Sequence, residues 1–156
     1  MRITVVTSSY PRFPGDGAAP FVQSICQHLA GLGHQIEVIA PYDPLVCNQP
    51  NQSVPVHRFR YAPVKKWHIM GHARALIGDM HFRRGVFLLL PLFLIAEFWT
   101  TLWVAVRQKA DIIYVHWVLP NGLAGALVAL ILRIPLALSL HGSDIFVAQR
   151  HWTFRR

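Results

Sequence analysis

The chain has 156 residues, of which 53% are hydrophobic and only 14% are charged, and its formal net charge is +8. This composition excludes intrinsic disorder, because the apolar residues are numerous enough to offset the entropy that folding costs. The length is that of one domain. The surplus of apolar residues predicts that part of the surface contacts another domain, a partner or a membrane.

Strands and helices alternate along the chain. Short β-branched and apolar runs predict strands over residues 3–7, 36–40, 54–61, 111–116 and 136–140, and helical spacing predicts helices over 20–33, 86–106 and 121–133. The spacing of Phe21, Ile25, Leu29 and Leu32 predicts the first helix, with Gly33 as its stop. Because a strand, a helix and a second strand open the chain, these two strands should be parallel. The sequence therefore predicts one α/β domain over residues 1–156, an open, mainly parallel sheet with helices on both faces.

Most of the positive charge lies between residues 57 and 84. The basic residues there are Arg58, Arg60, Lys65, Lys66, Arg74, Arg83 and Arg84, against Asp79 as the one acidic residue, and His57, His68, His72 and His81 accompany them. Such a segment suits an anionic membrane surface, a phosphorylated ligand or nucleic acid, and a solvated basic face is the alternative. Aromatic residues are not interleaved with the basic ones as a base-stacking platform needs, so nucleic acid is not the expected partner. Lys65, Lys66, Arg83 and Arg84 are the candidates for a membrane-surface patch.

Residues 86–106 form an apolar segment long enough to span a bilayer. Pro91 and Glu97 oppose spanning, and Glu97 shares one helical face with Thr100, Thr101 and Gln108. A single crossing would also place the flanking strands, which we predict to share one sheet, on opposite sides of the membrane. We therefore expect a helix partly buried on the sheet and partly in contact with a bilayer surface. A wholly buried core helix and a true span are the alternatives.

Cysteine usage and the first residues bear on metal binding and location. Cys26 and Cys47 are too far apart for a zinc site or a redox pair, and Cys26 falls on an apolar helical face that suits a core residue. Residues 2–7 read as a strand and not as a secretory signal, so a cytoplasmic location is expected. No metal site is predicted.

Polar residues gather at three predicted corners that follow strands. The corners are the loop 10–20 with Gly15, Asp16 and Gly17, the stretch from His116 to Asn121, and the turn His141–Gly142–Ser143–Asp144, which leads into a predicted last helix. In open α/β sheets, ligands bind at these carboxyl ends of the strands, where helix N-termini present free N–H groups. A histidine there can position a hydroxyl or stabilise developing charge, and a buried ring bonded to backbone is the alternative. The loop glycines do not match the GxGxxG fingerprint, so an NAD site is not expected.

The ordered set of these segments resembles the N-terminal, acceptor-side domain of glycosyltransferase family 4. The segments that carry the resemblance are residues 1–11, the glycine-bearing loop, residues 32–41, Tyr61–Ala62–Pro63, residues 111–117, and Ile134–Pro135 before residues 140–145. The resemblance implies a Rossmann-like domain that forms the N-terminal half of a two-domain GT-B enzyme. Such enzymes transfer a sugar from a nucleotide-sugar to an acceptor with retention of configuration and without an essential metal or other cofactor.

The resemblance also implies roles for particular residues. His141 matches the family's catalytic histidine, which contacts the donor sugar, and Gly15, Asp16 and Gly17 match the loop beside the donor diphosphate. The positions that match the cleft and acceptor side are His116, Asn121, Gly142 and Asp144. The family's C-terminal domain holds the basic pair and the Glu-x7-Glu motif that bind the donor, and neither follows here. We therefore expect a domain that is incomplete at its C-terminal end and inactive alone.

The expected partners are a nucleotide-sugar, a polysaccharide or lipid-linked sugar acceptor, the donor domain and an anionic membrane surface. The enzyme is then expected on the cytoplasmic face of the membrane as a peripheral protein. Two hypotheses from other classes remain beside it. One is a non-catalytic basic module that binds nucleic acid or a membrane surface. The other is an integral membrane protein with one span.

Overall fold

The structure, a computed structural model, describes residues 1–47, 53–72, 84–142 and 144, with the side chains of residues 84–87 excepted. Its centre is a five-stranded parallel sheet in the order β3-β2-β1-β4-β5. The strands are β1 (Arg2–Thr7), β2 (Gln35–Pro41), β3 (Val56–Phe59), β4 (Ile112–His116) and β5 (Leu136–Ser139). The predicted open parallel sheet is confirmed, and each strand lies where its β-branched or apolar run predicts it.

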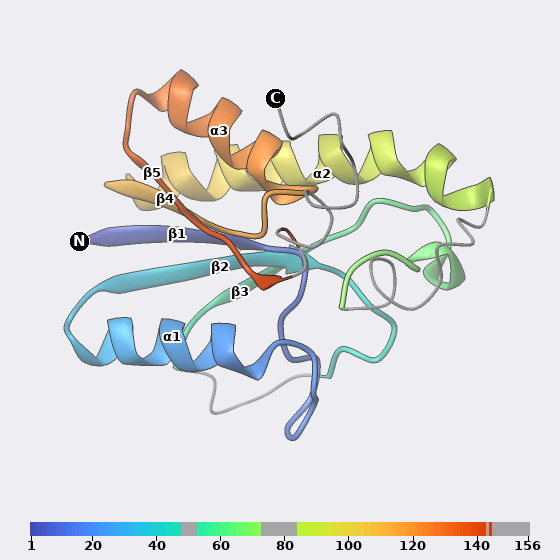
Figure 1. Cartoon of the computed structure of the whole chain (residues 1–156), viewed down its shortest axis with the longest axis horizontal. Helices are drawn as coiled ribbons and strands as arrows, with labels where there is room; N and C mark the ends of the chain where they lie inside the picture. Colours follow the sequence, from blue (N-terminus) through green and yellow to red (C-terminus); the bar gives the residue numbers. More distant parts are fainter. Residues whose placement is uncertain (48–52, 73–83, 143, 145–156) are drawn as a thin grey trace.

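Helices cover both faces of the sheet (Figure 1). α1 (Pro20–Gly31) lies on one face, and α2 (Arg84–Gln108) and α3 (Asn121–Leu132) lie side by side on the other. A short 3-10 helix, η1 (Lys65–Trp67), follows β3. Pro20 begins α1 because its fixed φ suits the first helical position. The predicted last helix after the turn 141–144 lies outside the described residues.

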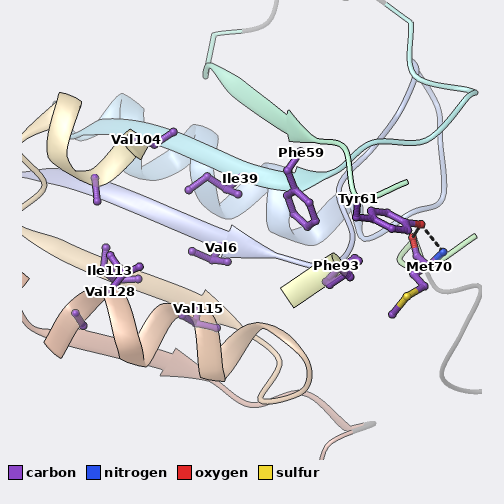
Figure 2. Packing of buried hydrophobic residues seen from close by; sticks show 12 residues of the cluster. Val6, Ile39, Phe59, Tyr61, Met70, Phe93, Val104, Ile113, Val115 and Val128 are labelled. Atoms are coloured by element: carbon purple, nitrogen blue, oxygen red, sulfur yellow. Dashed lines mark hydrogen bonds between the residues drawn. The ribbon is translucent and has the colours of Figure 1, made fainter. Parts of the chain in front are cut away.

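Two hydrophobic clusters lie on either side of the sheet because neighbouring strand residues point to opposite faces. Val5 and Val38 belong to the cluster under α1. Val6 and Ile39, the next residue along each strand, belong to the cluster under α2 and α3. Figure 2 shows this second cluster, with Phe93 of α2 among the strand side chains. Each helix layer therefore has its own apolar core, and the sheet lies between the two cores.

The face that α1 turns toward the sheet differs from the one its apolar spacing predicts. Phe21 is 41% exposed and Leu32 is 74% exposed, whereas Val22 and Cys26 are fully buried. The prediction of Cys26 as a core residue is confirmed. Phe21 lies in the first turn of α1, where it contacts the rings of Trp117 and His141.

The long apolar segment forms α2, whose part from Leu88 to Gln108 is long and apolar enough to cross a membrane. It instead connects β3 to β4 of the same sheet and packs against that sheet and α3. This is the place of a crossover helix and not of a membrane span. Partial burial of this segment is confirmed, because Phe93 and Val104 are fully buried while Trp99 is 62% exposed. Contact with a bilayer stays a prediction.

A candidate active site at the carboxyl end of the sheet

Two of the three predicted corners meet where β4 and β5 end. His116 is the last residue of β4, and it pairs in register with Ser139 of β5, two residues before His141. The Nδ1 atom of His116 lies 3.1 Å from the Nε2 atom of His141. The two rings are stacked, with centroids 5.4 Å apart and an interplanar angle of 13°. The parallel register therefore joins two histidines that are 25 residues apart in the chain.

Burial keeps His116 neutral. The ring is fully buried, and desolvation, with a smaller contribution from the nearby His141, lowers the pKa of His116 to about 4. Its backbone carbonyl accepts a hydrogen bond of 2.6 Å from the Nδ2 group of the buried Asn121. Because one proton lies between the two rings, either histidine can be the donor. In both arrangements the Nε2 atom of His141 is engaged, and Nδ1 is the ring nitrogen that the described part of the chain leaves for a ligand.

Aromatic rings surround His141 on further sides. The Trp117 ring centroid lies 4.6 Å from that of His141, and the Phe21 ring from α1 lies 4.9 Å from it. Trp117 has a positive φ of 66°, a conformation that costs energy for a bulky residue. The backbone N–H of Trp117 donates a hydrogen bond of 3.1 Å to the backbone oxygen of Ser139, and this bond holds Trp117 in that conformation. Sequence reasoning missed both aromatic contacts, since Phe21 matched a core position and Trp117 adjoined the more conspicuous His116.

Asp144 ties the two strand ends together. One carboxylate oxygen accepts the backbone N–H of His141 at 3.0 Å, and the other accepts the N–H of Val118, just after β4, at 3.2 Å. Gly142, which directly follows His141, is exposed. Asp144 thus contacts the predicted site, but its carboxylate is occupied with positioning the backbone that carries His141.

The third corner, the glycine-bearing loop, is built around Arg12 and Asp16. The Arg12 Nε and Nη2 groups donate to the two carboxylate oxygens of the buried Asp16 at 2.6 and 2.9 Å, and Arg12 also lies 3.5 Å from Asp43. This guanidinium holds the pKa of Asp16 well below its usual range. Gly15 has a φ of +81°, and a Cβ atom on it or on Gly17 would meet no neighbour within 4 Å. The backbone at Gly15 and Gly17 is therefore uncrowded, while the buried Asp16 side chain stabilises the loop through its bonds to Arg12.

The loop joins the histidine cluster through α1. It leads into Pro20, and the next residue, Phe21, contacts His141. The N-terminal end of α1 thus lies at the same sheet edge as the two histidines, which is where an α/β sheet places a bound ligand. The predicted role of Gly15 and Gly17 beside a donor diphosphate stays a prediction.

The described residues of the basic segment do not form one cationic face. Arg58 turns inward, where one of its Nη groups donates to Pro11 O at 2.6 Å. His72 is buried, and desolvation lowers its pKa to about 4. Lys65 and Lys66 are exposed on η1. Arg83 lies outside the described residues.

Of the four predicted patch residues, the structure therefore places only the two lysines, because Arg84 begins α2 but its side chain is not among those described. Within the described part of the chain, no three His, Cys, Asp or Glu side chains gather as metal ligands would.

Solved structures of glycosyltransferases are similar in fold to this chain. CalG4, the calicheamicin glycosyltransferase, matches with a TM-score of 0.59 at 15% identity, over 90% of this chain and 32% of its own. SsfS6 of Streptomyces sp. SF2575, in complex with thymidine diphosphate, matches with a TM-score of 0.54 at 18% identity, over 90% of this chain and 38% of its own. At such identities the likeness shows the fold alone. The protein therefore has the fold of a GT-B glycosyltransferase domain.

The sequence narrows the class further. The family model of the glycosyl transferase 4-like domain matches residues 16–156, so the chain belongs to that family. TuaC of Bacillus subtilis (strain 168), which is described as a teichuronic acid biosynthesis glycosyltransferase, is 27% identical over 161 residues, covering 94% of this chain and 38% of TuaC. The chain thus spans about two fifths of the length of this curated relative. The predicted resemblance to glycosyltransferase family 4 is confirmed.

Proposed function

We propose that the chain is the acceptor-side domain of a retaining, metal-independent glycosyltransferase. In this proposal it transfers a hexosyl group from a nucleotide-sugar to a polysaccharide or glycolipid acceptor, and it needs a donor-binding domain for turnover. The observation that carries the proposal is the His116–His141 pair at the carboxyl ends of adjacent parallel strands, beside the start of α1. The membership in the glycosyl transferase 4-like family supports the reaction class.

The residues of the site have distinct tasks in this proposal. His141 uses Nδ1 to hydrogen-bond a hydroxyl of the donor sugar, since its Nε2 is engaged with His116. The neutral His116 fixes the orientation of that ring without adding positive charge. Trp117 and Phe21 offer apolar ring surface on which the carbon-bound face of a sugar can pack. The open backbone at Gly15 and Gly17 allows a diphosphate to approach closely.

Three similar proteins support the substrate classes. SsfS6 and the spinosyn rhamnosyltransferase SpnG are both described in complex with thymidine diphosphate, which supports a nucleotide-sugar as the donor. TuaC is described as acting in teichuronic acid biosynthesis, which supports a polysaccharide as the acceptor. The competing hypothesis of a nucleic-acid-binding module is weakened by the inward placement of Arg58 and His72.

A transfer assay with radiolabelled nucleotide-sugars tests the proposal. We expect no turnover from the chain alone, and turnover when it is joined to the remaining portion of TuaC in place of the matched TuaC segment. In that chimera His141→Ala should abolish transfer, whereas His28→Ala on the exposed side of α1 should leave it unchanged. EDTA should have no effect, and NMR of the product should show the anomeric configuration of the donor.

Three outcomes would contradict parts of the proposal. Turnover by the chain alone would contradict the need for a donor domain. An active His141→Ala chimera would remove His141 from the reaction. Inversion at the anomeric carbon would reject the retaining mechanism while leaving the transferase class in place.

A further inference from the structure

The outward face of α2 is a continuous apolar stripe. Its members are 46–78% exposed, and they are Leu88, Leu92, Ile95, Trp99, Trp103 and Val106. They follow one another at intervals of three or four residues, so they lie along one side of the helix. We call these residues the α2 outer stripe. Such a stripe is long for a surface that faces only water.

The opposite side of α2 carries the polar residues. Glu97 and Thr101 are fully buried against the sheet. Their side-chain oxygens have no hydrogen-bond partner within the described part of the chain. A helix on the surface of a soluble domain turns its polar residues outward and its apolar residues inward. α2 does the reverse at these positions, which indicates that its outer side meets an apolar environment.

The neighbouring helix extends the apolar surface. α3 packs beside α2 on the same face of the sheet (Figure 1). Its exposed large hydrophobic residues are Leu123, Leu127, Leu130 and Ile131. The helix layer over this face of the sheet therefore presents apolar side chains from two adjacent helices.

The charges of the described residues favour an anionic partner. Every carboxylate that the structure describes is buried or already has a partner: Asp16 and Asp43 contact Arg12, Glu37 contacts Arg107, Asp111 contacts Arg2, Asp144 accepts backbone N–H groups, and Glu97 is buried. Exposed cations include Lys65 and Lys66 on η1, Lys109 at the end of α2 and Arg133 at the end of α3. The Arg107 guanidinium, which pairs with Glu37, also lies over the Trp103 ring of the stripe, 4.8 Å from its centroid.

From these observations we infer that the α2 outer stripe docks in the plane of an anionic phospholipid surface, with the exposed leucines of α3 beside it. Two tryptophans within the stripe suit this position, because the indole ring combines an apolar body with a polar N–H that stays at the interface. The helix lies on the bilayer and does not cross it, since its other side packs on the sheet. The inference is separate from the proposed transferase activity, because it concerns only where the chain sits.

Vesicle flotation tests the inference on the chain without any sugar substrate. We expect binding to phosphatidylcholine vesicles that contain phosphatidylglycerol, and weaker binding to pure phosphatidylcholine. Trp99→Glu and Ile95→Glu should each weaken binding about tenfold or more, because each replaces buried apolar area in the bound state with a charge. Leu32→Glu is the matched control, since Leu32 is 74% exposed and directly follows α1, the helix on the other face of the sheet (Figure 1). Circular dichroism should show all three variants folded, and Trp99→Ala provides a milder second variant.

Other outcomes would overturn the inference. Equal binding by the Trp99→Glu and Leu32→Glu variants would mean that the stripe does not contact lipid. If the stripe variants instead convert a dimer to a monomer in analytical ultracentrifugation and leave vesicle binding unchanged, the face belongs to a second copy of the chain. In a variant whose other tryptophans are replaced by Phe, quenching of Trp99 fluorescence by lipids brominated at the bilayer centre, with none from lipids brominated near the headgroup, would indicate spanning.

Discussion

Replacing Glu97 with Gln should stabilise the protein by an amount that grows with pH. Glu97 is fully buried on the sheet side of α2, and its carboxylate oxygens have no hydrogen-bond partner among the described residues. Desolvation raises its pKa from 4.5 to about 8. The folded protein therefore keeps Glu97 protonated at neutral pH, while the unfolded chain releases that proton.

The sign and size of the effect follow from these two pKa values. Between about pH 4.5 and pH 8 the folded state binds more protons than the unfolded state, so the free energy of unfolding falls as the pH rises. Each unit of pKa difference corresponds to about 1.4 kcal/mol. The difference of about 3.5 units is thus an upper limit of about 5 kcal/mol, reached near pH 8. Glu97→Gln has nearly the same shape and cannot ionise, so it removes this pH dependence and leaves the packing almost unchanged.

Urea denaturation of both proteins, followed by circular dichroism from pH 4.5 to pH 8, measures the difference. We expect similar unfolding free energies near pH 4.5 and a gap of several kcal/mol at pH 8, with the variant more stable. The buried histidines titrate in both proteins, so their contribution cancels from the difference. A gap that stays constant over this range would refute the reasoning, because it would mean that Glu97 ionises in the folded state.

Three further predictions concern the site and the loops around it. Burial lowers the pKa of His116 from 6.5 to about 4, so the free energy of unfolding should fall by up to about 3 kcal/mol as the pH falls from 6.5 to 4. The His116→Asn variant should lose this pH dependence in acid titrations monitored by fluorescence. Gly71→Ala should destabilise the protein by about 2 kcal/mol or more in thermal unfolding, because the φ angle of Gly71 is +88° and the new Cβ would lie 2.6 Å from Pro41 Cγ. Gly31→Ala is the control, since a Cβ on Gly31 meets open space. An equal effect of both substitutions would count against the steric argument. Asp144→Ala should cost about 2 kcal/mol in urea denaturation, since it leaves two backbone N–H groups without their acceptor, and a cost near zero would show that water replaces the carboxylate.

The histidine pair was predictable in outline because its cause is local. His116 and His141 each follow a β-branched or apolar run, and strands separated by one helix pair in parallel. Parallel strands bring their carboxyl ends to one edge of the sheet, so two histidines at strand ends become neighbours. The order and type of the elements follow from the same short-range signals, which explains why each predicted strand is present in the sheet.

Contacts between distant segments could not be predicted in this way. Arg58 lies in a basic segment, yet its guanidinium points inward and donates to the carbonyl of Pro11. Phe21 has the spacing of a core residue, yet it contacts the rings of Trp117 and His141. Each of these placements depends on the position of another segment that is distant in the sequence. No periodicity within the segment contains that information.

The orientation of α2 shows the division most clearly. Apolar residues occur on all sides of this helix, so its sequence predicts a long helix and leaves the choice of the buried side open. Packing against the sheet and α3 decides that choice. Phe93 and Val104 fill the core, and Glu97 and Thr101 are buried because they lie on the same side of the helix. The sequence by itself thus determined the elements, their order and the strand ends at which the site forms. Only the tertiary structure decided which side of α2 is buried, because that depends on the shape of the surface it packs against.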